Sequence, residues 1–388
     1  MFSVFKYATL LVVIALFSFA QPALAAKYAT LQTSCMEVYQ PASNAPSAVT
    51  IEGRETWQMP EPGAIGDFAE ARYTPTGRTF ELKHTEVSNQ CRTSECYLFA
   101  VINYIHVNNM HNNASRVGPM RVSEPFLVAH KFLQHIIEGV WYGVDNIKVV
   151  HDLKGGFGYE AVQLTRKVGI VPKESWTPNV PFESWDMNQV YSTLQTKVPE
   201  WNRYLQSLAN KYGTWEHPEV RKAQQLAYDT LKKTVLDLTG PLPESFTFNG
   251  TVYTPKEFEG LAGLPRERKL AIDNKEGFAL PSNAKEVLNE AMVNTGGSWK
   301  FQEGDYNTII NETVRFLEAG HPVIIDLRWK ADGHSMLITG YEYNAQNKIT
   351  RLKVMNSWGP SYANDGYVWY TLDDVWNNVS RVYKFGAL

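Results

Sequence analysis

The sequence contains few cysteines, no long run of charge of one sign and one long apolar run. Only three cysteines, Cys35, Cys91 and Cys96, occur in 388 residues, so at most one disulfide can form within the chain. The formal net charge is −3 and there is no basic stripe, which argues against nucleic acid as a partner. Hydrophobic residues make up 44% of the chain and aromatic residues 13%, which is ample for a packed core.

The long apolar run, Ala8 to Ala20, lies near the N-terminus. Lys6 precedes it and the small-residue site Ala23-Leu24-Ala25 follows it, so residues 1–25 are predicted to be a secretory signal peptide. The run is too short to span a bilayer comfortably, and an uncleaved anchor is the alternative. No other stretch is long and apolar enough for a membrane helix. We therefore expect a periplasmic or secreted protein without stable membrane insertion.

Residues 26–82 are polar and contain five prolines, which exclude a long helix. An N-terminal arm is favoured over an inhibitory pro-segment. Further along, apolar spacing and caps predict four helical regions. They are residues 123–140, 159–167, 186–212 (one or two helices, broken near Pro199) and 217–240.

Asn249-Gly250 lies between alternating residues and predicts a hairpin, after which a helix starts at Thr254. The last third is rich in β-branched and aromatic runs separated by turn residues, at 323–329, 334–343, 348–355, 366–372 and 382–385. Helices followed by antiparallel strands predict an α+β fold of two lobes with a cleft between them.

A cysteine stands at the head of the apolar run Tyr97 to Val107. This run is apolar almost all round, which predicts a buried central helix. A thiol at a helix N-terminus faces the positive end of the helix dipole, which favours the thiolate. Cys96 is therefore a candidate nucleophile. The amide of Gln90, six residues upstream, can donate to an oxyanion formed nearby.

The C-terminal third carries a histidine and an asparagine that match this cysteine. His334 opens one predicted strand, and Asn356 follows the next one in Asn356-Ser357-Trp358-Gly359. His321, which precedes its own strand, is the rival histidine. Each residue alone is better explained by a core or turn position, and only the three together supply the residue types of a nucleophilic triad.

These segments resemble those of papain-like cysteine peptidases. The resemblance rests on two motifs. In the first, Gln90 is followed after five residues by Cys96, an aromatic residue and then Phe99-Ala100, and the second is the Asn356–Gly359 segment. It implies a helical lobe and an antiparallel sheet or barrel lobe. It also implies a triad of Cys96, His334 and Asn356, an oxyanion hole that includes Gln90, and a shielding Trp358.

The resemblance extends to two weaker features. Gly155 and Gly156 resemble the glycine pair that lines the substrate cleft, although an ordinary turn explains them equally well. The stretch from Phe246 to Phe258 resembles the bleomycin hydrolase and aminopeptidase C branch of the family. Residues 83–388 are then the peptidase domain, with a mostly helical insertion at about 181–300.

Four positions depart from the family pattern. Glu95 precedes the cysteine, and a carboxylate there opposes thiol ionisation unless it points away. Tyr97 replaces the usual Trp, Thr93 stands where a structural cysteine is usual, and Gly333 precedes His334.

The sequence therefore predicts an exported cysteine peptidase that acts on peptides and needs no cofactor or metal. Two alternatives remain open, an inactive papain-like peptide-binding or adhesion module and another Cys–His acyl-transfer enzyme of the amidase or transglutaminase type. The oligomeric state and the substrate preference do not follow from the sequence.

The cysteine count gives one further expectation. In an oxidising compartment free thiols tend to pair, and the nucleophile must stay free, so Cys35 and Cys91 are the natural partners. The rivals are that both are free, or that Cys91 pairs with Cys96.

Overall fold

The computed structural model describes residues 73–91, 93–141, 155–156, 158–265, 292–294, 303–329, 332–360 and 362–384. The expected signal peptide, most of the N-terminal arm, Cys35 and parts of the 181–300 segment lie outside the described residues. The division of the chain at residues 25, 82, 181 and 300 stays a prediction.

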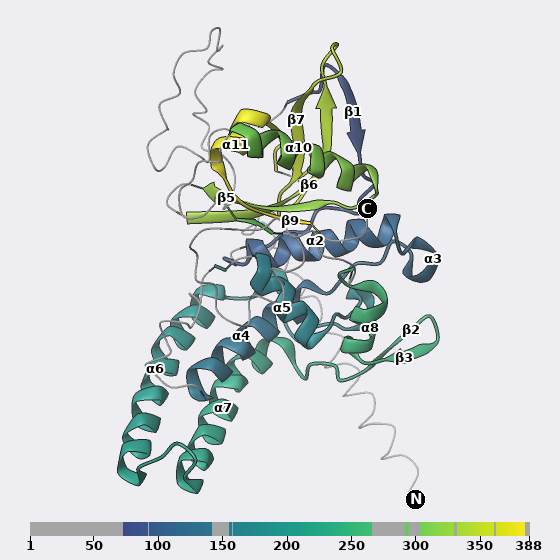
Figure 1. Cartoon of the computed structure of the whole chain (residues 1–388). Helices are drawn as coiled ribbons and strands as arrows, with labels where there is room; N and C mark the ends of the chain where they lie inside the picture. The colour runs from purple at the N-terminus through teal and green to yellow at the C-terminus, as the bar shows by residue number, and fades with distance from the viewer. Residues whose placement is uncertain are drawn as a thin grey trace, which may run out of the picture.

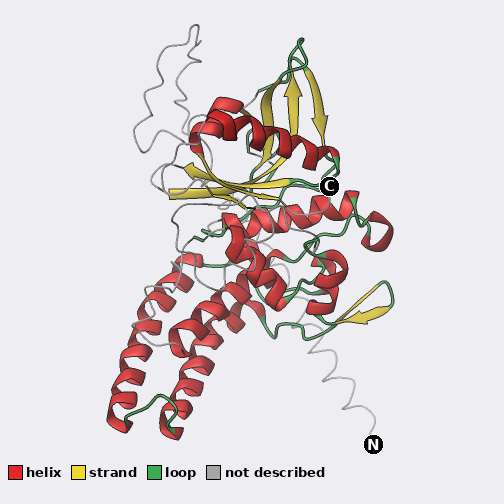
Figure 2. Cartoon of the chain, in the orientation of Figure 1, coloured by secondary structure: helices red, strands yellow, loops and turns green. Residues whose placement is uncertain are grey.

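Most of the helices precede most of the strands along the chain. Figure 2 shows that the large sheet and most of the helices lie in different parts of the molecule. The α-helices are α2 (Cys96–His111), α3 (Ala114–Val117), α4 (Glu124–Trp141), α5 (Gly158–Val168), α6 (Met187–Tyr212), α7 (Pro218–Thr239), α8 (Pro255–Ala262), α10 (Glu303–Glu318) and α11 (Leu372–Asn378). The strands are β1 (Arg78–Glu81), β2 (Phe246–Phe248), β3 (Thr251–Tyr253), β4 (Met292–Asn294), β5 (Val323–Trp329), β6 (Asp332–Tyr343), β7 (Ile349–Met355), β8 (Tyr367–Thr371) and β9 (Val379–Lys384).

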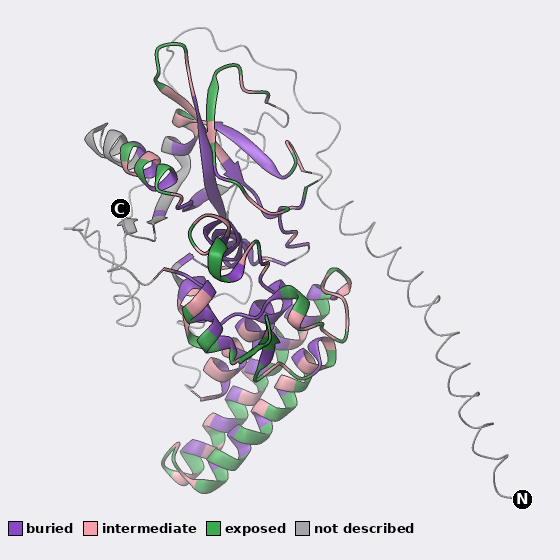
Figure 3. Ribbon diagram, turned by 90° about the vertical axis from the view of Figure 1, so that its right-hand side faces the viewer, coloured by how far each residue is buried: buried purple, intermediate pink, exposed green. Residues whose placement is uncertain are grey.

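Helix α2 lies between the sheet and the other helices (Figure 1). Every residue from Cys96 to Asn109 is buried, which confirms the predicted central helix (Figure 3). Because this helix is apolar on all sides, it packs on β6 with one face and on α5 with another. Its N-terminal residue, Cys96, is thereby held at the junction of the two lobes.

Strand β6 organises the sheet lobe. The sheet has the order β4-β9-β5-β6-β7-β8, and β1 pairs with the end of β6 that β5 leaves open. All the pairings are antiparallel, as predicted. The strand β1 was not expected, because it lies at the end of the segment taken for an arm. The architecture is the predicted α+β fold of a helical and a sheet lobe.

A pair of long helices, α6 and α7, projects from the helical lobe (Figure 1). Asp186 caps α6, and His217 with Pro218 opens α7. The helices pack on each other and on α4. The predicted break near Pro199 is wrong, because Pro199 lies inside a single helix. The apolar stripe of α6, buried against its neighbours, outweighs the one lost backbone hydrogen bond.

The predicted hairpin and the helix after it are confirmed. Asn249 and Gly250 have φ of 48° and 78°, the positive values that a tight hairpin turn requires. Thr254 then forms a capping box with Glu257 at the start of α8. Among the described helices, none is both long and apolar enough to cross a membrane.

Buried histidines make the fold sensitive to acid. His106 lies within α2, where its Nε2 accepts from the backbone N–H of Val122 at 2.8 Å. Burial lowers the pKa of His106 from 6.5 to about 3, and burial lowers that of His130 to about 4. Below pH 6.5 these histidines therefore bind protons in the unfolded chain but not in the folded chain, so the free energy of unfolding falls as the pH falls.

We expect the free energy of unfolding to drop by about 2 kcal/mol per fully buried histidine between pH 7 and pH 5. Urea unfolding at several pH values measures this slope. His106→Gln keeps an acceptor for Val122 and should flatten the slope, whatever its stability at pH 7. An unchanged slope in this variant would show that His106 does not contribute.

Candidate active site

Cys96 is the first residue of α2, and its thiol lies against the sheet lobe. The carbonyl oxygen of Glu95 accepts from the N–H groups of Leu98 and Phe99 at 2.9 and 3.1 Å, which starts the helix at this point. The backbone of Ser335, on β6, hydrogen-bonds the thiol. The residue next to His334 therefore touches the candidate nucleophile.

His334 and Asn356 are bound to each other. Their Nε2 and Oδ1 atoms are 2.8 Å apart, and both side chains are buried. With Nε2–H donating to Asn356, the neutral imidazole keeps Nδ1 as its acceptor. The indole of Trp358 lies beside the imidazole, with 5.1 Å between ring centroids.

Gln90 is joined to the asparagine segment from the other side. Its backbone N–H donates to the carbonyl of Ser357 at 2.7 Å, and its side-chain Oε1 accepts from the Ser357 hydroxyl. The amide Nε2 donates to the carbonyl of Thr93 at 2.7 Å. An amide nitrogen has two hydrogens, so the Gln90 amide carries one N–H besides the one that bonds Thr93.

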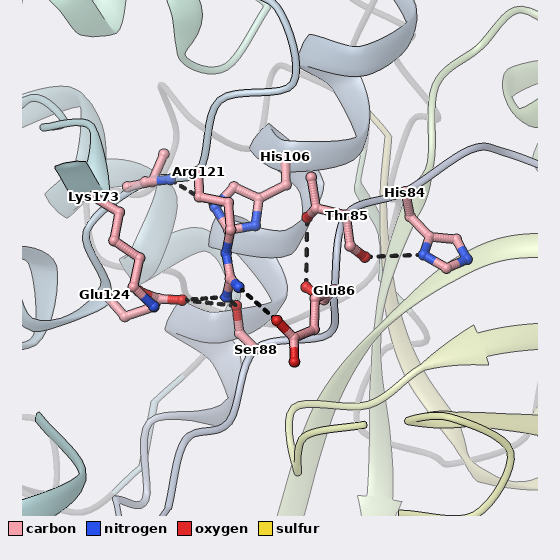
Figure 4. Close-up of polar contacts among 9 residues, drawn as sticks. His84, Thr85, Glu86, Ser88, His106, Arg121, Glu124 and Lys173 are labelled. Atoms are coloured by element: carbon pink, nitrogen blue, oxygen red, sulfur yellow. Dashed lines mark hydrogen bonds and ion pairs between the residues drawn. The ribbon is translucent and has the colours of Figure 1, made fainter. Parts of the chain in front are cut away.

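A buried polar cluster holds the segment that carries Gln90 (Figure 4). The Ser88 hydroxyl donates to Glu124 at 3.0 Å, and Arg121 bonds both residues, at 3.2 and 2.9 Å. The Ser88 carbonyl accepts from the backbone N–H of Gly359, the last residue of the asparagine segment. Because Glu124 opens α4, the cluster ties the Gln90 segment to the helical lobe. These residues could not be recognised from the sequence, since a serine and an ion pair carry no local catalytic pattern.

The electrostatics of the pair differ from the expectation based on the helix dipole. Burial raises the pKa of Cys96 to about 12, with Asp326 and Glu95 acting in the same direction. Burial also lowers the pKa of His334 to about 4, although Asn356 opposes this. The free site therefore holds a neutral thiol and a neutral imidazole over most of the pH range, rather than the thiolate that the helix N-terminus favours. Desolvation of the two groups outweighs the dipole here.

The glycine pair adjoins the residue that follows the cysteine. Gly155 and Gly156 have φ of 94° and 157°. A Cβ on Gly156 would lie 2.6 Å from the Tyr97 ring and 2.5 Å from Glu160, whereas a Cβ on Gly155 would meet nothing within 4 Å. The second glycine thus makes room for Tyr97, and the first presents open backbone.

His321 does not belong to the site. Its Nδ1 lies 3.1 Å from the Asn112 amide, just beyond the C-terminal end of α2. Since α2 has 16 residues, this is about 24 Å along the helix from Cys96. His334 is the histidine that contacts Asn356. Cys96 is a free thiol, whereas the expected partner of Cys91 lies outside the described residues.

No group of three or more His, Cys, Asp or Glu side chains suited to a metal ion occurs in the part of the chain that the structure describes.

Two sequence families match consecutive parts of the chain. Residues 71–258 match the Peptidase C1-like family, and residues 254–384 match the Peptidase_C39 like family. The first match includes Gln90 and Cys96, and the second includes His334 and Asn356. No curated protein matches the sequence.

Solved structures are similar to this one. The structure of pepw from Lactobacillus rhamnosis HN001 has a TM-score of 0.59 and 18% identity, over 80% of this chain and 81% of that chain. Xylellain, a cysteine protease from Xylella fastidiosa, has a TM-score of 0.38 and 13% identity, over 82% and 91%. Bromelain from Ananas comosus has a TM-score of 0.35 and 11% identity, over 79% and 97%. The likeness to pepw is the one that supports the fold.

The two glycines give a matched pair for a stability test. Alanine at either position meets left-handed backbone strain, on the order of 1–3 kcal/mol. Only Gly156→Ala also collides with Tyr97, so we expect it to cost a further 1–3 kcal/mol, roughly the cost of overpacking. Urea unfolding of both variants measures the difference. Equal losses would show that Tyr97 does not need the missing side chain.

Proposed function

We propose that this chain is a papain-like cysteine peptidase, which hydrolyses peptide bonds with Cys96 as nucleophile, His334 as general base and Asn356 orienting the imidazole. The observation that carries the proposal is the buried His334–Asn356 hydrogen bond of 2.8 Å, since it fixes the tautomer that leaves Nδ1 as an acceptor. The thiol that this nitrogen would serve lies against the neighbouring residue, Ser335.

Acylation begins when His334 takes the proton of the Cys96 thiol as the sulfur attacks the peptide carbonyl carbon. Negative charge then develops on the carbonyl oxygen. The remaining N–H of the Gln90 amide and the backbone N–H of Cys96 stabilise it, because the first N–H groups of a helix have no partner within the helix. The imidazolium gives its proton to the leaving amine, and the acyl group stays on sulfur.

Deacylation uses the same groups. His334 accepts a proton from water as the water attacks the thioester, and returns it to the sulfur as the acid product leaves. Because the neutral pair predominates in the free site, proton transfer accompanies attack instead of preceding it. His334 with a pKa of about 4 is in its base form at neutral pH, so protonation of the base limits activity only in acid.

We further propose that the protein is exported and that Cys35 is bonded to Cys91. The N-terminal sequence pattern supports export. Cys96 is a free thiol, so Cys35 and Cys91 are the two cysteines left to pair, which supports the bond. The bond would anchor the N-terminal arm beside the Gln90 segment. The bond would close a loop of about 56 residues, and in the chain-entropy model closing such a loop stabilises the folded state by roughly 4 kcal/mol.

The catalytic roles are tested by single substitutions. Cys96→Ala and His334→Ala should each lower kcat by several orders of magnitude, because the members of a triad act as a unit. Asn356→Ala should cost less, since it removes only the orientation of the ring. Hydrolysis of a peptide library, with circular dichroism as the control for folding, measures this. Full activity in Cys96→Ala would contradict the proposal.

Export and the disulfide are tested on secreted material. N-terminal sequencing of the exported protein should begin at Ala26. Peptide mapping without reduction should give a Cys35–Cys91 linked fragment and an alkylatable Cys96. A Cys91–Cys96 link, or three free thiols, would reject the bond, and retention of residues 1–25 would reject the cleavage site.

A further inference from the structure

A carboxylate that the proposed chemistry does not use lies directly beside the nucleophile. Glu95 precedes Cys96 and its side chain is fully buried. Its Oε1 is 2.7 Å from Nζ of Lys131, a residue of α4 whose side chain is only 10% exposed. A buried carboxylate is tolerated when a cation and hydrogen bonds compensate its charge, and Lys131 supplies the cation.

The second partner of this carboxylate comes from the projecting helices. The hydroxyl of Tyr191, in the first two turns of α6, donates to Oε1 of Glu95 at 3.0 Å. The same hydroxyl oxygen accepts from the backbone N–H of Ser94 at 3.1 Å. Burial and Glu95 raise the pKa of Tyr191, so the hydroxyl keeps its proton and donates it.

The result is that the backbone before the nucleophile is held from several sides. Tyr191 bonds Ser94 and Glu95 together, Lys131 bonds Glu95 to α4, and the Glu95 carbonyl starts α2. The peptide that links Glu95 to Cys96 carries the N–H proposed for the oxyanion. A change in its orientation would move that N–H and the thiol together.

We propose that Tyr191, acting with Glu95 and Lys131, is a positioning residue for Cys96, so that the root of α6 sets the place of the nucleophile and of its backbone N–H. The inference rests on the proposed function for its kinetic consequence, but not for its effect on the thiol. It assigns the long helix pair a role in the active site. The ring of Tyr191 itself is held by an edge contact with Phe132 of α4, at 5.8 Å between centroids.

The network also sets the charge next to the thiol. The carboxylates that act on Cys96 are Glu95 before it and Asp326 on β5, while Tyr97 on α2 interacts with Cys96 and hydrogen-bonds Glu95. Both carboxylates oppose thiolate formation. Lys131 carries the opposite charge and contacts the Glu95 carboxylate directly. Removing Glu95 and removing Lys131 should therefore change the ease of thiol ionisation in opposite directions.

The first experiment measures kinetics of the full-length protein on a cleaved peptide. Tyr191→Phe keeps the ring and loses both hydrogen bonds, and we expect kcat to fall about tenfold to hundredfold with KM nearly unchanged. Tyr204→Phe is the matched control, because this tyrosine lies on the same helix and is 50% exposed. A Tyr191→Phe enzyme with wild-type kcat would overturn the proposal.

The second experiment measures the rate at which iodoacetamide labels Cys96, followed by mass spectrometry from pH 6 to 10. Glu95→Gln should react about threefold to tenfold faster below the thiol pKa, and Lys131→Met slower by a similar factor. The double variant should return close to wild type. If the network had only a structural role, both single variants would change the labelling rate in the same direction. That result would reject the positioning role.

These readouts separate the two proposals. Wild-type protein that cleaves no peptide, with opposite shifts of labelling in the two variants, would reject peptidase function and support the network. Active wild-type protein, with labelling rates that shift in the same direction in the two variants, would support peptidase function and reject the network. Should Lys131→Met not fold, Glu95→Gln decides the point, because a labelling rate equal to wild type would contradict the inference.

Discussion

The burial of helix α2 from Cys96 to Asn109 is the constraint on which the rest of the structure depends. A helix that is apolar on all sides must be covered on all sides, and here the sheet covers one side and α5 the other. Its N-terminal residue, Cys96, therefore lies where the two lobes meet. The polar groups at that end cannot reach water freely, so the protein must supply partners for them.

The antiparallel register of β6 and β7 supplies the second half of the site. Leu337 pairs with Met355 at the end of the β6–β7 ladder, and His334 and Trp358 each lie three residues beyond this pair. The observed contact of the two rings agrees with that alignment. Asn356 follows the last residue of β7, where the chain leaves the sheet and its amide can reach the imidazole. A shift of one residue would turn His334 to the other face of the sheet.

Much of this could be predicted because the information is local. Hydrophobic periodicity predicted the ends of α4, α5 and α7 to within about two residues, and the Asn-Gly turn predicted the hairpin. Gln90, Cys96 and Asn356 stand in short motifs that chance rarely assembles in order. The prediction failed at Pro199 because packing of α6 on α4 and α7, which decides the outcome, is not visible within the helix itself.

The partners of these motifs could not be predicted, because they are distant in the chain. Lys131 lies 36 residues from Glu95, and Tyr191 lies 96 residues from it. No spacing rule connects a carboxylate with a lysine on one helix and a tyrosine on another. The same holds for Ser357, which reaches Gln90 across 267 residues. The sequence therefore indicates which groups react, whereas only the fold shows what holds them.

The energetic cost of such a network bears on its purpose. A buried ion pair seldom stabilises a protein more than apolar side chains of the same size, because desolvation of the two charges offsets their attraction. Stability alone is then a poor reason for a glutamate beside the nucleophile. Directional bonds from Tyr191 and Lys131 fix the backbone there in a way that apolar packing cannot, since dispersion contacts have no preferred direction. The added negative charge makes the Cys96 thiol harder to ionise, which agrees with the proposed mechanism in which His334 removes the proton as the sulfur attacks.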